Sequence, residues 1–353
     1  MVFRVLVAND DGIDAPGLRA LVRALAATGE MEVYVSAPSV DKSAVSHSLS
    51  VLKGTMEVRE RVVEGACKAF AVGGTPVESV QFAFLGPCFK DVKFDLTCSG
   101  INRGPNVGMN IIYSGTCAAA RESLIQGVPA IAFSYEHFRP EDTEFDPCAA
   151  ISARIALAYL RAAADTPALG LMKRECFLNV NYPLQPEKMK GLCLALQGND
   201  RIDSKFELDE AGNKSGGFAH DAEGNKIMHF KISLGGQFQC TAAASDGLAL
   251  QERLASLTPC GLFSGASERA GTAAAAVAAV GPEAAESERR TFDVGSGEEM
   301  GAAVTAALTR FARFAAAAQP DISLSSQGVY KNLDELFTTP KSTPVKSGPP
   351  AKK

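Results

Sequence analysis

The chain has 353 residues, of which 46% are hydrophobic and 21% are charged, a composition typical of globular proteins and not of fibrous or wholly disordered ones. The formal net charge is −5, which gives no electrostatic basis for binding a nucleic-acid polymer but does not exclude a single nucleotide as a ligand. The sequence has no apolar run long enough to cross a membrane and no signal-peptide pattern at its start, which predicts a cytoplasmic protein without a membrane partner.

Nine cysteines are scattered along the sequence, and none forms a Cys-x-x-Cys pair. Most lie in apolar surroundings, as Cys98 does in the segment Asp95-Leu96-Thr97-Cys98. This pattern predicts reduced, buried thiols and neither a disulfide framework nor a zinc site.

The first 40 residues have the pattern of a strand, a helix and a second strand. Residues 2–8 are apolar and end at Asn9-Asp10-Asp11-Gly12, which predicts a buried strand followed by a loop. Pro16 suits the first turn of a helix, and a second apolar run follows at residues 31–37. Such a unit requires parallel strands and a helix that covers one face of the sheet.

The alternation continues to about residue 180. A capping box with a proline at Thr75-Pro76-Val77-Glu78 predicts a helix over residues 76–85. Further helices are expected over 117–126 and 151–162, and further strands over 94–98, 128–134 and 176–180. The predicted fold class is therefore α/β, a Rossmann-like, doubly wound and mainly parallel sheet, whose ligands bind at the carboxyl ends of the strands.

The character of the sequence changes after residue 196, which sets the predicted domain organisation. One domain is expected over residues 1–265, with a core at 1–196 and β-hairpin extensions at 197–265. The remaining chain divides by composition into an Ala-rich low-complexity insertion (266–295), a C-terminal helical segment (296–337) and a disordered basic tail (338–353).

Asp10 and Asp11 form the strongest local feature for chemistry. Adjacent carboxylates at the carboxyl end of a strand favour a hard divalent cation, although Asn-Asp-Asp-Gly also suits an ordinary solvated turn. The loop after the second strand contains several serines, and the segment Ser99-Gly100-Ile101-Asn102 offers an amide oxygen to the same edge. Tyr113-Ser114-Gly115-Thr116 opens a helix, whose N-terminus is suited to a phosphate. Together these loops predict a metal and phosphate site.

Five motifs in order resemble the SurE family of survival-protein nucleotidases. They are VLVANDDGIDAPG (5–17), Ala37-Pro38 with Lys42-Ser43, Gly74-Thr75-Pro76, SGINRGPNVG (99–108) and YSGT (113–116). The resemblance is dense over residues 2–135 and continues more sparsely at 178–181 and 257–259.

The resemblance implies a phosphatase that needs one divalent ion per subunit, Mg²⁺ or Mn²⁺, and that hydrolyses nucleoside 5′- and 3′-monophosphates. It implies a homodimer or homotetramer built partly by C-terminal oligomerisation extensions. Asp10, Asp11 and Asn102 would be catalytic, and together with Ser43 they would hold the metal. The substrate phosphate would contact residues from three loops: Asn9, Asn106, Ser114, Gly115 and Thr116.

Several positions depart from the usual family pattern. Glu78 and Ser79 replace a common Asp-Cys pair that we interpret as structural, and His47 and Ser39 occupy positions more often held by Asn and Asp. His47 lies in the expected active-site loop without a sequence neighbour that orients it. The mechanism is therefore expected to use metal-activated water or a carboxylate and no histidine.

Other phosphate-binding proteins also place two acids after the first strand. A haloacid dehalogenase-like phosphatase uses Asp-x-Asp, in which both side chains point to one face, whereas Asp10 and Asp11 are adjacent. A non-enzymatic receiver-like module would need an aspartate where Ser99-Gly100-Ile101-Asn102 follows a strand. No dinucleotide or Walker motif is present.

Overall fold

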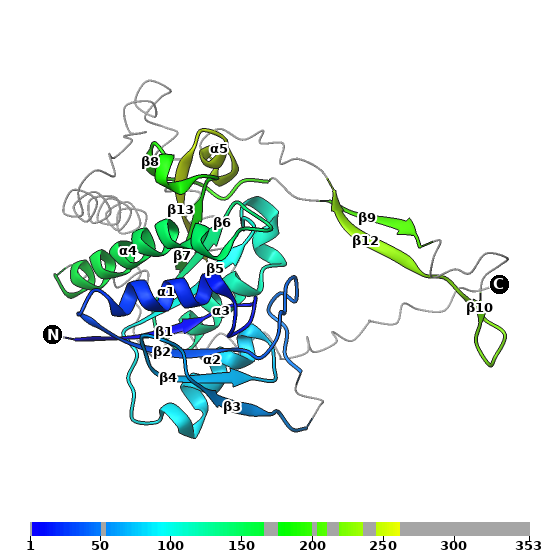
Figure 1. Ribbon diagram of the computed structural model, residues 1–353, viewed down its shortest axis with the longest axis horizontal. Coiled ribbons are helices and arrows are strands. Elements are labelled where there is room, and N and C mark those ends of the chain that lie inside the picture. Colours follow the sequence, from blue (N-terminus) through cyan, green and yellow to red (C-terminus); the bar gives the residue numbers. More distant parts are fainter. Residues whose placement is uncertain are drawn as a thin grey trace, which may run out of the picture. The chain divides into compact units, whose positions relative to one another are not determined.

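The computed structural model describes residues 2–50, 54–165, 176–199, 203–209, 219–235 and 245–261. A nine-stranded sheet with the order β3-β4-β2-β1-β5-β6-β7-β13-β8 forms its centre (Figure 1). The expectations for 266–295, 296–337 and 338–353 concern segments outside the described residues.

Parallel pairing dominates this sheet. Six neighbouring strands are parallel to one another: β4, β2, β1, β5, β6 and β7. β3 runs antiparallel to β4, and β13 runs antiparallel to β7. The predicted doubly wound, mainly parallel α/β sheet is thus confirmed. The strands are β1 (Phe3–Ala8), β2 (Met31–Pro38), β3 (Val58–Arg61), β4 (Ala66–Val72), β5 (Leu96–Arg103), β6 (Ala130–Tyr135), β7 (Cys176–Tyr182), β8 (Gly191–Leu194) and β13 (Leu254–Gly261).

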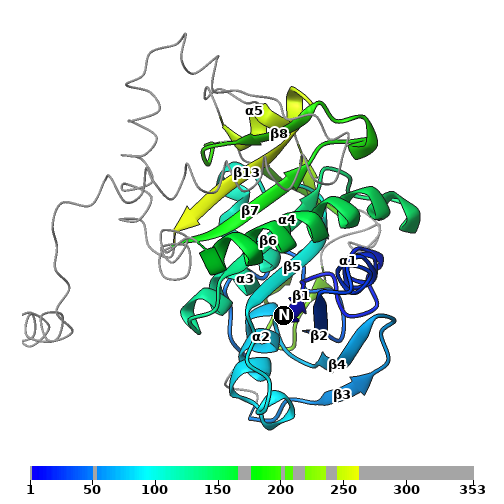
Figure 2. The ribbon, with the colours of Figure 1, turned by 90° about the vertical axis from the view of Figure 1, so that its left-hand side faces the viewer.

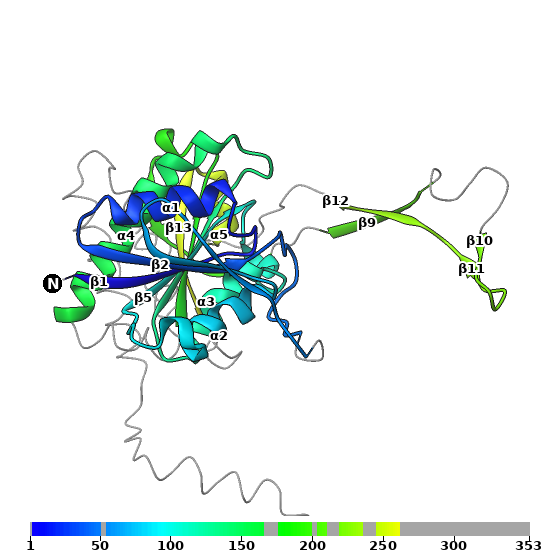
Figure 3. The ribbon, with the colours of Figure 1, turned by 60° about the horizontal axis from the view of Figure 1, so that its bottom comes forward.

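Helices cover both faces of the sheet (Figure 3). α1 (Pro16–Ala26) packs beside α4 (Phe145–Asp165) on one face, and α2 (Pro76–Leu85) packs beside α3 (Gly115–Ile125) on the other. A short helix, α5 (Asp246–Gln251), precedes β13 and contacts it. Short 3-10 helices are η2 (Pro87–Phe89), η3 (Gly108–Ile112), η4 (Asp142–Glu144) and η6 (Pro186–Lys188).

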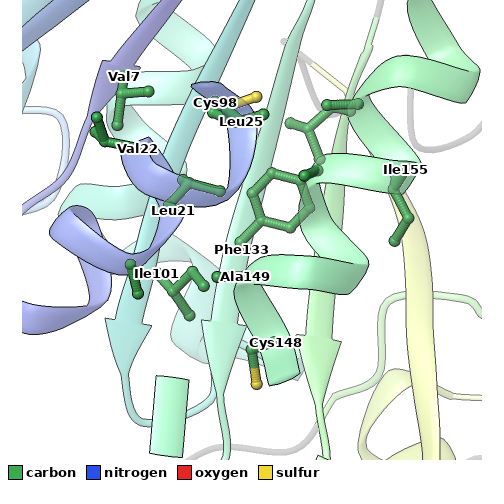
Figure 4. Close-up of a cluster of buried hydrophobic side chains, with 14 of the residues drawn as sticks. Val7, Leu21, Val22, Leu25, Cys98, Ile101, Phe133, Cys148, Ala149 and Ile155 are labelled. Carbon is green, nitrogen blue, oxygen red and sulfur yellow. The ribbon is translucent and has the colours of Figure 1, made fainter. Parts of the chain in front are cut away.

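The alternation of side chains along β1 explains this arrangement. Val5 and Val7 belong to the core under α1 and α4, whereas Leu6 and Ala8 belong to the core under α2 and α3. Figure 4 shows Val7 in the first of these cores with Leu21 of α1 and Ile155 of α4. A strand that is apolar on both sides must lie at the centre of the sheet, and β1 does.

The start of α2 follows the predicted capping box. The Thr75 hydroxyl accepts the backbone N–H of Glu78, and the Glu78 carboxylate accepts the N–H of Thr75 at 2.8 Å. Pro76 occupies the first helical position, and the helix ends at Leu85, so its predicted bounds are confirmed.

Some predicted bounds are wrong. The strand expected over 94–98 is β5, which runs on to Arg103, because Ser99-Gly100-Ile101-Asn102 continues to pair with β6 across an irregular register instead of turning. The helix expected over 151–162 begins earlier, at Phe145, where a 3-10 turn precedes it.

The strand that completes the sheet on the far side of β7 comes from the end of the described chain. β13 lies between β7 and β8 (Figure 2), pairing antiparallel with β7 and parallel with β8. β8 is therefore joined to the sheet through a strand that is about 60 residues further along the chain.

Two strand pairs separate from the large sheet lie within the range 197–265 for which hairpins were expected, whereas β13 of the same range belongs to the large sheet. β9 (Asp203–Leu208) pairs with β12 (Phe230–Gly235), and β10 (Ala219–His220) pairs with β11 (Lys226–Ile227). Both pairs are antiparallel.

The predicted burial of the cysteines holds only in part. The eight cysteines within the described residues are free thiols. Cys98, Cys117, Cys148 and Cys260 are buried, whereas Cys67, near the start of β4, is exposed. None of the helices in the described ranges is long and apolar enough to cross a lipid bilayer.

Candidate active site

The candidate site lies where the sheet changes its direction of winding. β1 has β2 on one side and β5 on the other, so the loops after these three strands meet at one edge. Asp10 and Asp11 follow β1, and Asn102 lies at the end of β5. Residues 39–50, which contain several serines and are called the serine loop below, follow β2. The backbone N–H of Lys42 donates to the Asp10 carbonyl at 2.7 Å, which holds the serine loop against the carboxylate pair.

Asn9 shapes the turn that carries the two carboxylates. Its Nδ2 donates to the Gly12 carbonyl at 2.8 Å, and its Oδ1 accepts the Gly12 N–H at 3.2 Å. Gly12 has a φ of +102°, which only glycine adopts readily. Both polar atoms of the Asn9 side chain are used within the turn, which suits a residue that supports the carboxylates.

Asp10 is buried, with 3% of its surface exposed, and its carboxylate faces the first turn of α3. The Thr116 hydroxyl donates to Asp10 Oδ1 and lies 3.3 Å from Asn102 Oδ1. Burial, with a smaller contribution from the neighbouring Asp11, raises the pKa of Asp10 to about 7. An ionised Asp10 is therefore costly unless a cation compensates its charge.

Gly115 is required for this close approach of helix and carboxylate. A Cβ at this position would lie 2.7 Å from the Asp10 Cβ and 3.0 Å from its Oδ2. A side chain at position 115 would therefore collide with Asp10. The backbone of the first helical turn, at Gly115 and Thr116, faces the carboxylate end of β1.

Asp11 has a different kind of partner. Its Oδ1 accepts from Nε of Arg103 at 2.9 Å, and its Oδ2 accepts the backbone N–H of Arg103 at 3.1 Å. Burial raises the pKa of Asp11, while the hydrogen bonds and charge of Arg103 act in the opposite direction. Of the two adjacent acids, Asp10 thus accepts from the neutral hydroxyl of Thr116, and Asp11 accepts from the charged guanidinium of Arg103.

Asn102 is oriented by its own loop. Its Nδ2 donates to the Gly104 carbonyl at 2.8 Å and to the Arg103 carbonyl at 3.2 Å. Because both amide hydrogens are directed into the loop, Oδ1 is left on the side of Thr116 and Asp10. An amide oxygen in this orientation is suited to a hard cation.

The Ser43 hydroxyl is exposed and does not contact Asp10 or Asp11 in this structure. The backbone N–H and the hydroxyl of Ser43 donate to Asp41 Oδ1 at 2.8 and 2.7 Å. The Lys42 contact brings this segment to the edge of the site, and Asp41 accepts the hydrogen bond of the Ser43 hydroxyl. The oxygen of Ser43 therefore keeps lone pairs free for another partner.

Asn106 is the most firmly held of the predicted phosphate residues. Its N–H donates to Asn181 Oδ1 at 2.7 Å, its Nδ2 donates to the Ser134 hydroxyl at 2.9 Å, and its carbonyl accepts from Asn179 Nδ2 at 2.7 Å. Ser134 lies near the end of β6, Asn181 near the end of β7 and Asn179 in the middle of β7. The sequence showed Asn179 and Asn181 only as part of a sparse resemblance.

Asp246 is a buried residue that sequence reasoning missed. Its carboxylate accepts the backbone N–H of Gly108 at 3.1 Å and that of Gly198 at 2.9 Å. The Gly108 carbonyl in turn accepts from Gln197 Nε2 at 3.0 Å. The only sequence signal was an acid directly after the serine that caps a short helix, Ser245.

Ser114 and Glu78 act at helix starts. Ser114 caps α3 by accepting the N–H of Cys117 at 3.0 Å. Glu78, which we interpreted as structural, also accepts the N–H of Ser50 at 2.6 Å and its hydroxyl at 2.7 Å. The serine loop is thereby fastened to α2 at its far end.

His47 is oriented by a residue that is distant in sequence. Its Nε2 lies 3.0 Å from Glu122 Oε2, and Glu122, only 2% exposed, also accepts from Gln81 and Gln126. Because Glu122 is on the second turn of α3 and Gln81 is on α2, this contact fastens the middle of the serine loop to both helices.

The donors at this edge fit a hard cation. Asp10 and Asp11 supply carboxylates, Asn102 supplies an amide oxygen, and the burial of Asp10 favours a compensating positive charge. Within the described ranges no three His, Cys, Asp or Glu side chains gather as a metal site, so a set that includes amide and hydroxyl oxygens is the one this edge offers.

Comparisons with known proteins point to one family. A sequence model described as "Survival protein SurE" matches residues 5–204. A protein named 5'-nucleotidase SurE from Carboxydothermus hydrogenoformans is 37% identical over 205 residues, which are 58% of this chain and 74% of the relative. A protein of the same name from Desulfatibacillum aliphaticivorans is 35% identical over 256 residues, 72% of this chain and 90% of the relative.

A solved structure is also similar to this chain. The SurE protein from Aquifex aeolicus matches with a TM-score of 0.54 and 30% identity, covering 74% of this chain and 94% of that one. The match with a family model over more than half of the chain means that the likeness includes the loops of the candidate site as well as the sheet.

Proposed function

Because this chain belongs to the SurE family, we propose that it is a divalent-metal-dependent nucleotidase that hydrolyses nucleoside 5′- and 3′-monophosphates to nucleosides and phosphate. The curated relatives carry the name 5'-nucleotidase SurE. The observation that carries the proposal is the meeting of Asp10, Asn102 and the start of α3 around the Thr116 hydroxyl.

The residues of the site divide into cation and phosphate ligands. Asp10, Asp11, Asn102 and Ser43 would hold one Mg²⁺ or Mn²⁺, because they are the oxygen donors that face or border the edge of β1. When bound, such an ion polarises a phosphoryl oxygen and lowers the pKa of a coordinated water. The backbone N–H groups of Gly115 and Thr116 would bind the phosphate at the start of α3, with the Asn106 loop beside it.

The surrounding contacts keep this arrangement rigid. Thr116 fixes Asp10 through its hydroxyl, and Asn102 cannot rotate without losing its bonds to Gly104 and Arg103. Preorganised donors of this kind stabilise charge that develops on a transferring phosphoryl group without reorganisation during the reaction.

An assay of phosphate release tests the proposal. Nucleoside monophosphates are offered to the metal-stripped protein with and without Mg²⁺ or Mn²⁺, and hydrolysis is expected only with the ion. Asp10→Asn and Asn102→Ala should each lower kcat/KM at least about a hundredfold while the fold is kept. Asp14→Asn, which alters an exposed ion pair with Arg19, is the matched control and should stay within about twofold.

The same assay separates the alternatives. Turnover that is insensitive to chelator would exclude the metal mechanism. A phosphoaspartate trapped on Asp10 or Asp11 would favour a haloacid dehalogenase-like reaction, and uptake of phosphate from acetyl phosphate without nucleotide hydrolysis would favour a receiver-like module.

We also propose that the protein is a homodimer or homotetramer. Support comes from the β9–β12 pair, in which Phe206, Leu208, Phe230 and Ile232 are exposed. These residues face one another across the pair, Phe230 opposite Leu208 and Ile232 opposite Phe206, so they form one apolar face.

A further inference from the structure

The Arg103 side chain contacts two acids of the candidate site, Asp11 and Asp41, and the proposed reaction gives it no role. Its Nε and Nη2 atoms both lie 2.9 Å from Asp11 Oδ1, and its backbone N–H donates to Asp11 Oδ2. Both oxygens of one proposed cation ligand are consequently engaged by a single residue.

Arg103 also has a second acidic partner. Its Nη2 donates to Asp41 Oδ2 at 2.7 Å, while Asp41 Oδ1 accepts from the backbone N–H and the hydroxyl of Ser43. The guanidinium thus links the loop after β1 to the loop after β2 from its own place at the end of β5. With 38% of its side chain exposed, it is able to move without disturbing the core.

We propose that Arg103 is the built-in counter-ion of the cation site: its guanidinium and the divalent ion are alternative partners of the Asp11 carboxylate, and Asp41 retains the arginine when the ion takes Asp11. The inference rests on the proposed function, because it assumes that Asp10 and Asp11 bind the ion. The arginine would then set the affinity of the site without being a ligand.

Charge and burial support this competition. Asp11 is buried, so a bare carboxylate there is costly, and Arg103 compensates it in the absence of an ion. A divalent ion close to the guanidinium is repelled by it. The exposed Asp41 offers the displaced guanidinium a partner at the rim, where like charges are better screened.

Calorimetric titration of Mn²⁺ into the metal-stripped full chain tests the inference without any turnover. Arg103→Met removes the charge but keeps a side chain of similar length, and its Kd for Mn²⁺ should fall at least about fivefold. Arg161→Met removes the same charge from an exposed pair with Glu30 and should leave Kd within about twofold. Equal tightening by both variants would reduce the effect to net charge and overturn the inference.

The role of Asp41 is tested by a double-mutant cycle. Asp41→Asn keeps an oxygen for Ser43 but weakens the hold on Arg103, so Kd should rise in the wild-type background. In the Arg103→Met background the same change should have a much smaller effect, because Asp41 then has no arginine to retain. An equal effect in both backgrounds would contradict the retention by Asp41.

Asp10→Asn separates this inference from the proposed function. If the wild type, Arg103→Met and Asp10→Asn all fail to bind Mn²⁺, or if Asp10→Asn leaves Kd unchanged, the cation site itself is wrong. If Asp10→Asn abolishes binding while Arg103→Met binds Mn²⁺ no more tightly than the wild type, the site stands and the counter-ion role falls.

Discussion

Two adjacent aspartates in this protein differ in what neutralises them, and the difference has a measurable effect on stability. Within the described part of the chain, Asp10 has no cationic side chain among its hydrogen-bond partners, and its pKa of about 7 lies well above the value of 3.8 expected for an exposed aspartate. A raised pKa in the folded state means that the group stabilises the fold fully below its unfolded pKa and loses this contribution as pH rises through the folded pKa. A gap of about three pK units corresponds to about 4 kcal/mol.

We therefore predict that the metal-stripped protein becomes less stable as pH rises from about 4 to about 7, by several degrees in Tm. Asp10→Asn removes the ionisation, so its Tm should fall less over this range and should exceed that of the wild type at pH 8. Differential scanning calorimetry in EDTA measures both. Saturating Mn²⁺ is the control, because an ion that binds ionised Asp10 offsets the loss in the wild type only. Parallel slopes of the wild type and the variant in EDTA would contradict the prediction.

At the scale of elements, the loop from 104 to 108 depends on residues that follow it by 70 to 140 positions in the chain. Asn179 and Asn181 hold Asn106, and Asp246 holds Gly108. The buried carboxylate of Asp246 accepts several backbone N–H groups. An amide in its place would bring its own N–H donor against at least one of these N–H groups.

Asp246→Asn should accordingly destabilise the protein by about 1–3 kcal/mol and loosen this loop. Hydrogen exchange read by mass spectrometry should show faster exchange of the amides at 104–108. The matched control is Asp221→Asn, because Asp221 also accepts backbone N–H groups, of Glu223 and Asn225, but within an exposed turn. Unchanged protection of the loop in Asp246→Asn would show that Asp246 stabilises α5 but not the loop.

The sequence predicted best where a local rule and the final contacts agree. The bounds of α2 followed from Thr75, Pro76 and Glu78, because a capping box is complete within four residues. The end of β5 was misjudged because Ser99 to Asn102 have the composition of a turn, and only pairing with β6 keeps them extended. Asp10, Asp11 and Asn102 were expected at one edge because strand ends converge there, whereas Arg103, His47 and Asp246 depend on contacts between distant segments that no local pattern reveals.

At the scale of the whole molecule, the apolar face of the β9–β12 pair should be covered by a second copy of the chain. Phe206 and Ile232 are opposite each other and are 65% and 67% exposed in the single chain. Replacing both with serine should lower the mass measured by light scattering after size-exclusion chromatography, because apolar area drives such contacts. Glu207→Ser with Lys231→Ser, a cross-strand pair on the other face, should leave the mass unchanged. A wild-type monomer would contradict the proposal.

The position of β13 has a consequence for how this protein is made. β7 is complete when residue 182 has left the ribosome, but the strand that pairs with its outer edge ends at residue 261. At the usual elongation rate of about 5–20 residues per second, that edge and β8 wait for several seconds without their neighbour. An open parallel sheet edge can pair with another chain, so chaperone protection during synthesis matters most over this interval.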